Sequence, residues 1–288
     1  MLRITTAWCI VLADISHLQW YVLEMPRKVS LLILALFLLS TFTLGQPSAD
    51  DAVKAIQNLE KYREGLIPLW MSDFGNLARY REANAKLAMP SAGEDRVVFM
   101  GDSITDIWNL AKYFPGKPYV NRGIGGQTTP QMLIRFRPDV IALRPNVVVI
   151  MAGTNDIAGN TGPMSLAEIE SNYATLAELA RAHSIRVVLS SVIPVNNYTE
   201  RSKMFFPLRS PEQILELNRW MKNYCAQNGC VFLDYFTPMV DDKGLLKADL
   251  AEDGLHPNDK GYAIMAPLAQ KAIEQALTSN VYGPCANK

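Results

Sequence analysis

The sequence predicts an α/β protein: a three-layer α/β/α sandwich of flavodoxin-like topology, built on a five-stranded parallel sheet, with an N-terminal helical extension. Short apolar runs rich in β-branched residues, such as the one at 147–151, have the length and composition of buried parallel strands. Segments of helical periodicity separate these runs, an alternation typical of a parallel sheet with helices on both faces. The 288 residues and 49% hydrophobic content suffice for one well-packed domain.

Five segments have the composition and the flanking turn residues of strands. We expect them at 97–100, 119–122, 146–151, 185–190 and 231–233. In an open parallel sheet, ligands bind outside the carboxyl ends of the strands, so the residues that follow each strand are the first candidates for a functional site.

The helices are predicted from their capping residues and their periodicity. From Asp50 to about Leu87 the pattern is helical, and the turn residues at 90–93 end it. A short helical segment carrying Trp108 follows the first strand. Thr129 is expected to cap a helix with Pro130 at its first position, running toward Leu143 and kinked or divided at Pro138.

Three further helices are expected in the second half of the chain. Ser165 and Glu168 form a capping box for a helix that runs to about His183. The other two run from Ser210-Pro211 to about Asn228 and from about 259 to 276, and we expect the stretch at 194–210 to be long and irregular.

The N-terminus contains a targeting signal. Arg27 and Lys28 precede an apolar run from Val29 to Leu44, which is shorter than the ~20 residues that a membrane-spanning helix needs. We therefore expect a secretory signal that starts at Met25, is cleaved near Gly45 and leaves a secreted or periplasmic protein with no stable membrane insertion. A membrane anchor is the alternative. The expected organisation is an upstream extension and signal at 1–45, a helical layer at 46–92 and the main domain at 93–280.

Charge and cysteine content exclude some functions. Lys plus Arg and Asp plus Glu both number 28, so nothing favours nucleic acid or an anionic membrane as a partner, and the oligomeric state stays open. After signal cleavage, which removes Cys9, the sequence leaves open whether Cys225 pairs with Cys230 or whether Cys285 pairs with one of them. None has a zinc-ligand spacing with histidine, so no structural zinc is implied. We also expect no other metal and no cofactor.

Candidate reactive residues follow four of the five strands. Ser103 follows the first strand, Gly126 the second, Asn155 the third, and Asp253 and His256 the fifth. Each is an ordinary turn residue by itself. Together they lie past carboxyl ends of strands, where they can converge on one site, and we expect Ser103 to be a nucleophile there.

The general base is found by elimination among three histidines. His17 is expected to be removed with the signal, and His183 lies at the opposite edge of the sheet. His256 remains, and Asp253, three residues before it, can accept from the imidazole Nδ1–H and fix its tautomer.

A hydrolytic serine also needs donors for the oxyanion that develops on the substrate. The backbone N–H groups of Ser103 and Gly126 and the side-chain amide of Asn155 can supply them. The glycines at 123–126 could instead cradle a phosphate, but no lysine follows in the spacing of a phosphate-binding loop.

These motifs resemble the SGNH, or GDSL, hydrolase superfamily, including its platelet-activating-factor acetylhydrolase-like branch and bacterial carbohydrate acetylesterases. Four blocks occur in the family order, with Ile104 where Leu is usual in the first: 101–104, 121–126, 153–156 and 253–256. By this resemblance, which covers roughly residues 95–275, the nucleophile, oxyanion donors, base and orienting aspartate are those named above.

The resemblance implies a serine esterase that cleaves short acyl, foremost acetyl, esters of glycans or small molecules without a metal, and the N-terminal signal implies that this enzyme is secreted. Alternatives are a lipase or lysophospholipase, a catalytically silent glycan-binding protein on the same fold, and a nucleotide-binding protein of flavodoxin-like topology. Trp108, Tyr198 and Phe205 are candidates for substrate contacts; the aromatic residues near 198–206 could equally cover a helix.

Overall fold

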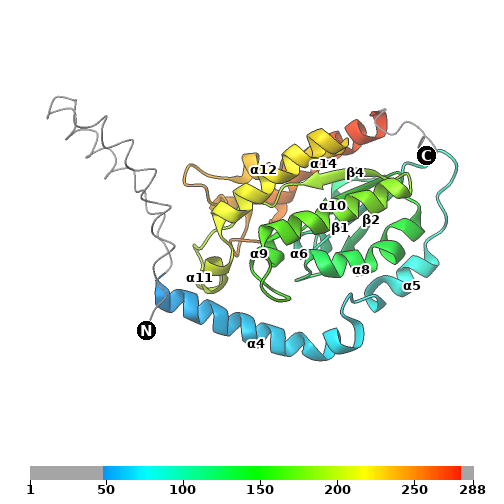
Figure 1. Ribbon diagram of the computed structural model, residues 1–288. Helices are drawn as coiled ribbons and strands as arrows, with labels where there is room; N and C mark the ends of the chain where they lie inside the picture. Colours follow the sequence, from blue (N-terminus) through cyan, green and yellow to red (C-terminus); the bar gives the residue numbers. More distant parts are fainter. Residues whose placement is uncertain (1–47, 280–288) are drawn as a thin grey trace, which may run out of the picture. The chain divides into compact units, whose positions relative to one another are not determined.

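The computed structural model describes residues 48–279. The predicted signal, its cleavage site, His17, Cys9 and Cys285 lie outside the described residues. Five strands form one parallel sheet in the order β2-β1-β3-β4-β5, which is the flavodoxin-like order. Helices flank the strands (Figure 1), and the predicted fold class is confirmed. The strands are β1 (Val97–Gly101), β2 (Tyr119–Gly123), β3 (Val147–Met151), β4 (Arg186–Ser190) and β5 (Val231–Leu233).

Helices cover both faces of this sheet, because alternate side chains of the buried strands point to opposite sides. One face packs against α8 (Thr129–Asp139), α10 (Leu166–Ala182) and α12 (Pro211–Asn228). The other face packs against α14 (Asp259–Thr278) and an aromatic cluster that includes Trp108.

The register aligns the carboxyl ends of three adjacent strands, β2, β1 and β3. Gly101 at the end of β1 lies beside Gly123 of β2 and Met151 of β3. The residues that follow these strands therefore begin at the same edge of the sheet. Three short helices start there or nearby: α6 (Ser103–Asp106), α7 (Leu110–Tyr113) and α9 (Thr154–Ile157).

One expectation about helix α8 needs a small correction, and another is confirmed. The cap is Thr128, whose backbone N–H donates to the Gln131 side chain at 3.1 Å, whereas Thr129 is already helical. The Thr129 hydroxyl donates to Asp156 instead, so it cannot serve as the cap. Pro138 does interrupt the helix, which ends at Asp139 and is followed by the 3-10 turn η1 (Ile141–Leu143).

The stretch at 194–210 is more ordered than expected. It contains α11 (Glu200–Phe205) and the 3-10 helix η2 (Phe206–Leu208). Thr199 caps α11 by accepting from the backbone N–H of Ser202, a signal missed in the sequence because serine replaces the usual acidic residue of a capping box.

The N-terminal helical pattern forms two helices, α4 (Ala49–Asp73) and α5 (Ala78–Lys86). The Asp73 carboxylate accepts from the backbone N–H groups of Leu77 and Ala78 at 2.8 and 2.9 Å, which redirects the chain between them. Helix α4 packs against α11 and η2, and α5 packs against α8 (Figure 1). The remaining short helices are α13 (Phe236–Met239) and η3 (Ala248–Leu250).

A disulfide joins Cys225 near the end of α12 to Cys230 just before β5, one of the two pairings that the sequence left open. Among residues 48–279, no helix is both long and apolar enough to cross a membrane.

Candidate active site

Ser103 is held at the end of β1 by a tight turn. Asp102 caps α6 by accepting from the backbone N–H of Ile104 at 3.0 Å. Gly101 is required before it, since a Cβ there would lie 2.8 Å from the Cβ of Thr105 and 2.9 Å from the carbonyl oxygen of Met151. Strand and helix thereby fix the position of the serine hydroxyl.

The structure brings Ser103, His256 and Asp253 into one hydrogen-bonded chain. Ser103 Oγ lies 2.9 Å from His256 Nε2, and His256 Nδ1 lies 2.7 Å from Asp253 Oδ2. Burial opposes ionisation of Asp253, but hydrogen bonds from the side chain and backbone of His256 outweigh it, and the net pKa of this carboxyl is lowered. Asp253 is therefore ionised at neutral pH and can accept the hydrogen bond from His256 Nδ1.

The loop that carries Asp253 and His256 is closely supported. Gly254 has a φ of +76°, and a side chain there would meet the carbonyl of Asn196. Asn196 donates its backbone N–H to the Gly254 carbonyl at 2.9 Å, and the Gly254 N–H donates to the Tyr198 hydroxyl at 3.0 Å. Tyr198 is thus a support for this loop and not part of the cavity wall.

Gly126 and Asn155 lie at the same sheet edge as Ser103. Gly126 has a φ of +75°, and its carbonyl accepts from the Asn160 side chain at 3.0 Å. Asn155 donates through Nδ2 to the Gln127 carbonyl at 3.1 Å, with a longer approach of 3.4 Å to Asp102. Among the described residues, no acceptor engages the backbone N–H of Ser103 or Gly126.

Two buried carboxyl groups lie behind these residues. Desolvation raises the pKa of Asp102 to about 7 and that of Asp156 to about 6. Asp156 accepts from the backbone N–H of Thr129 at 2.8 Å and from its hydroxyl, which ties α9 to the start of α8. Both carboxyls lie in the sequence blocks at 101–104 and 153–156, but nothing in the sequence indicated their burial.

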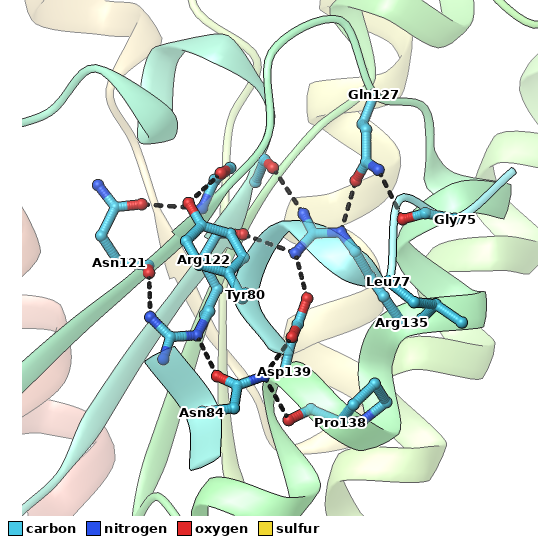
Figure 2. Close-up of polar contacts among 12 residues, drawn as sticks. Gly75, Leu77, Tyr80, Asn84, Asn121, Arg122, Gln127, Arg135, Pro138 and Asp139 are labelled. Atoms are coloured by element: carbon cyan, nitrogen blue, oxygen red, sulfur yellow. Dashed lines mark hydrogen bonds and ion pairs between the residues drawn. The ribbon is translucent and has the colours of Figure 1, made fainter. Parts of the chain in front are cut away.

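A buried arginine connects several parts of this edge (Figure 2). Arg135 of α8 donates to the carbonyls of Gly101 at 3.0 Å and Arg122 at 2.8 Å, pairs with Asp139 at 3.1 Å, and donates to the Gln127 side chain. The Gln127 backbone carbonyl in turn accepts from Asn155. One guanidinium thus braces the residues preceding Ser103 and those beside Asn155.

The N-terminal helices are bonded to the same network (Figure 2). Gln127 donates to the carbonyl of Gly75 at 2.9 Å, and the Tyr80 hydroxyl donates to the carbonyl of Gly123. Asn84 donates to Asp139 at 2.7 Å and accepts from Arg122 at 2.8 Å. The contacts of Gln127 and Tyr80 are buried and those of Asn84 are part-buried, and no motif in the sequence indicated them.

A cavity of about 250 Å³ opens above Ser103 and His256. Helix α4 contributes Leu59 and Tyr62 to its wall, and the α11–η2 region contributes Phe205. Trp108, expected among the substrate contacts, is placed elsewhere: it is 3% exposed in the core and stacks on Tyr262 with ring centroids 5.1 Å apart. Its bulk and apolar surface favour the core over the cavity wall.

Comparison with known proteins identifies a family and several relatives of this chain. The family model of the GDSL-like lipase/acylhydrolase family matches residues 99–264. A putative acylhydrolase of Bacteroides fragilis is 41% identical, covering 71% of this chain and 99% of its own, with a TM-score of 0.67. A GDSL-like lipase of Bacteroides thetaiotaomicron is 43% identical, covering 71% of this chain and 100% of its own, with a TM-score of 0.66.

An acetylxylan esterase of Geobacillus stearothermophilus is 26% identical over 60% of this chain and 90% of its own. The family match spans the segment from β1 to α14, which is the part of the fold that carries all five candidate residues. The chain therefore belongs to the GDSL-like lipase/acylhydrolase family and is a carboxylic ester hydrolase.

Proposed function

We propose that the protein is a secreted serine esterase that removes short acyl groups, foremost acetyl, from glycans or small-molecule esters through an acyl-enzyme on Ser103. The observation that carries this proposal is the chain from Ser103 Oγ to His256 Nε2 at 2.9 Å and from His256 Nδ1 to Asp253 at 2.7 Å. Nucleophile, base and orienting carboxylate are within hydrogen-bond reach of one another, as acyl transfer requires.

The first half of the reaction forms the acyl-enzyme. His256 takes the proton of Ser103 as the oxygen attacks the ester carbonyl, and Asp253 stabilises the imidazolium that results. The tetrahedral oxyanion is bound by the backbone N–H groups of Ser103 and Gly126 and by the Asn155 amide. One Asn155 N–H has only the 3.4 Å approach to Asp102, too long for a strong bond, so it can turn to the substrate oxygen.

Collapse of this tetrahedral intermediate completes the acyl-enzyme, because His256 gives its proton to the leaving alcohol as the ester C–O bond breaks. In the second half, which releases the acyl group, His256 takes a proton from water as the water attacks the acyl-enzyme carbonyl. The tetrahedral oxyanion uses the same donors, and its collapse returns the proton to Ser103 and frees the carboxylic acid.

Two observations support a short acyl group. The cavity volume of about 250 Å³ is below the usual range of about 300–1,000 Å³ for sites that enclose drug-sized ligands. The Geobacillus stearothermophilus relative is named for deacetylation of xylan. Secretion is proposed from the basic pair at 27–28 and the apolar run that follows it.

The test is hydrolysis of p-nitrophenyl acetate by residues 46–288, beside Ser103→Ala at matched concentration and with EDTA present. We expect turnover by the wild type, none by the variant, and p-nitrophenyl acetate to be hydrolysed faster than the palmitate ester. Activity of Ser103→Ala equal to wild type would refute the mechanism. A preference for palmitate would instead favour a lipase-type enzyme.

A further inference from the structure

Arg209 lies in the wall of the active-site cavity, directly after η2 and together with Ser103 and His256. Its guanidinium carbon sits 5.6 Å from the centroid of the Phe205 ring, which also lines the cavity. The Nε atom is buried without a hydrogen-bond partner, and within residues 48–279 no carboxylate forms an ion pair with this guanidinium. A cation in the cavity is thus left without a counter-ion in contact.

The carboxylates near Arg209 are hydrogen-bonded to other groups. Asp253 uses Oδ1 to accept from the backbone N–H groups of Leu255 and His256 and Oδ2 to accept from the imidazole. Asp102 accepts from the backbone N–H of Ile104. Both contribute to the electrostatic environment of Arg209, yet neither is hydrogen-bonded to it. Burial lowers the pKa of Arg209 to about 10, so the side chain remains a cation at neutral pH.

Tyr62 of α4 supplies a second polar group to the same wall. Its hydroxyl lies against Gly126, close enough to occupy the position of a Cβ there. No hydrogen bond from this hydroxyl is formed within the described part of the chain. Burial raises the pKa of Tyr62, and the nearby charge of Arg209 offsets only part of that rise. Two unpartnered donors therefore face one cavity beside the proposed oxyanion donors.

We propose that Arg209 and Tyr62 bind a carboxylate carried by the substrate, and that the preferred substrates of this esterase are acidic esters. An unpaired cation in a partly desolvated cavity is unfavourable until an anion binds to it. The planar guanidinium donates two parallel hydrogen bonds to a carboxylate, a geometry that a neutral acetyl ester cannot use. The inference rests on the serine-esterase function proposed above and specifies its substrate class.

The carboxylate can belong to either half of the ester. It lies on the alcohol half in an O-acetylated acidic sugar and on the acyl half in a half-ester of a dicarboxylic acid. Two matched pairs of synthetic esters separate these sources. For the alcohol half the pair is 4-acetoxybenzoate and its methyl ester; for the acyl half it is mono-p-nitrophenyl succinate and p-nitrophenyl butyrate.

The experiment measures kcat/KM for both pairs with wild type, Arg209→Gln, Arg209→Lys, Tyr62→Phe and Ser103→Ala. The readout is the selectivity ratio, which is kcat/KM for the acidic ester divided by kcat/KM for the neutral ester of the same pair. We expect Arg209→Gln to lower this ratio about 10- to 100-fold for one pair, through KM, and Tyr62→Phe to lower it about 3- to 10-fold. Arg209→Lys keeps the charge without the planar fork, so its ratio should fall between those of wild type and Arg209→Gln.

Arg219→Gln is the matched control, because Arg219 is an exposed arginine on α12 and the change removes the same unit of charge. Its selectivity ratio should equal that of the wild type. Ratios unchanged in Arg209→Gln for both pairs, with hydrolysis that depends on Ser103, would overturn the inference. So would an equal loss on acidic and neutral esters, which is the behaviour of a counter-ion to Asp253. Absence of Ser103-dependent hydrolysis of all four esters would refute the proposed function itself.

A second measurement does not depend on the folding of the variants. The product 4-hydroxybenzoate should inhibit wild-type hydrolysis of p-nitrophenyl acetate competitively, with at least a tenfold lower inhibition constant than methyl 4-hydroxybenzoate if the carboxylate lies on the alcohol half. If the recognised carboxylate lies on the acyl half, succinate should have a lower inhibition constant than butyramide. Equal inhibition within both pairs would overturn the inference.

Discussion

Ser103 Oγ and His256 Nε2 lie 2.9 Å apart although 153 positions separate the two residues in the chain. Ser103 follows β1 near the middle of the sheet, and His256 lies on a loop between β5 and α14. The topology carries both to the same sheet edge, and the Gly254 turn completes the approach of the imidazole.

The hydrogen bond from His256 to Asp253 predicts the effect of Asp253→Asn. An asparagine cannot stabilise the imidazolium and can hold the imidazole in the wrong tautomer, so we expect kcat for p-nitrophenyl acetate to fall about 10⁴-fold. Circular dichroism should show an unchanged fold. Asp242→Asn, at an exposed carboxylate with no hydrogen bond to the site, is the control. A loss below tenfold would show that Asp253 does not orient the base.

Asn155 predicts a second kinetic effect. If its amide stabilises the oxyanion only in the transition state, Asn155→Ala should lower kcat about 10²- to 10³-fold with KM nearly unchanged. Steady-state kinetics at several ester concentrations separate the two parameters. A rise in KM with kcat preserved would instead place Asn155 in ground-state binding.

The sheet and the proposed catalytic residues could be predicted because each depends on local sequence. The buried strands are apolar runs with sharp ends, and the residues that follow them form short motifs in a fixed order. Once the strands were assigned, the parallel topology placed Ser103, Gly126, Asn155, Asp253 and His256 at one edge without any further information.

The substrate wall could not be predicted, because it depends on contacts between distant segments. Tyr62 reaches the cavity only through the packing of α4 on α11 and η2, and Arg209 has no motif around it. Trp108 is of a residue type that is common in binding sites, yet its side chain packs into the adjacent hydrophobic core. Whether a side chain lines the cavity or packs in the core depends on its direction, which the residue type does not reveal.

The buried Asp102 predicts how stability depends on pH. Burial raises its folded pKa from 3.8 to about 7, so between these values the folded state holds a proton that the unfolded state has lost. This contribution to stability is present below pH 3.8 and is lost as pH rises toward 7. Asp102→Asn keeps an acceptor for Ile104 and removes the titration, so its Tm relative to wild type should increase from pH 4 to pH 7. A difference that is independent of pH would contradict the prediction.

The buried ion pair between Arg135 and Asp139 predicts that replacing Arg135 lowers the stability of the protein and also its activity. The Arg135 side chain is 0% exposed and that of Asp139 is 2% exposed, so Arg135→Met leaves a buried carboxylate without its cation. The free energy of unfolding should fall by about 3–5 kcal/mol, measured by urea denaturation. Arg137→Met, at an exposed position on the same helix, should change it by less than about 0.5 kcal/mol.

The Arg135 variant also tests whether this residue positions the site. Arg135 holds the carbonyl of Gly101 two residues before Ser103 and the side chain of Gln127, whose backbone carbonyl holds Asn155. At a temperature where the variant is folded, kcat should therefore fall about tenfold or more, since small displacements of reacting groups are costly. The pH profile of kcat should keep its shape, because Arg135 does not transfer a proton. Full kcat in a folded Arg135→Met protein would mean that the network stabilises the fold without aligning the donors.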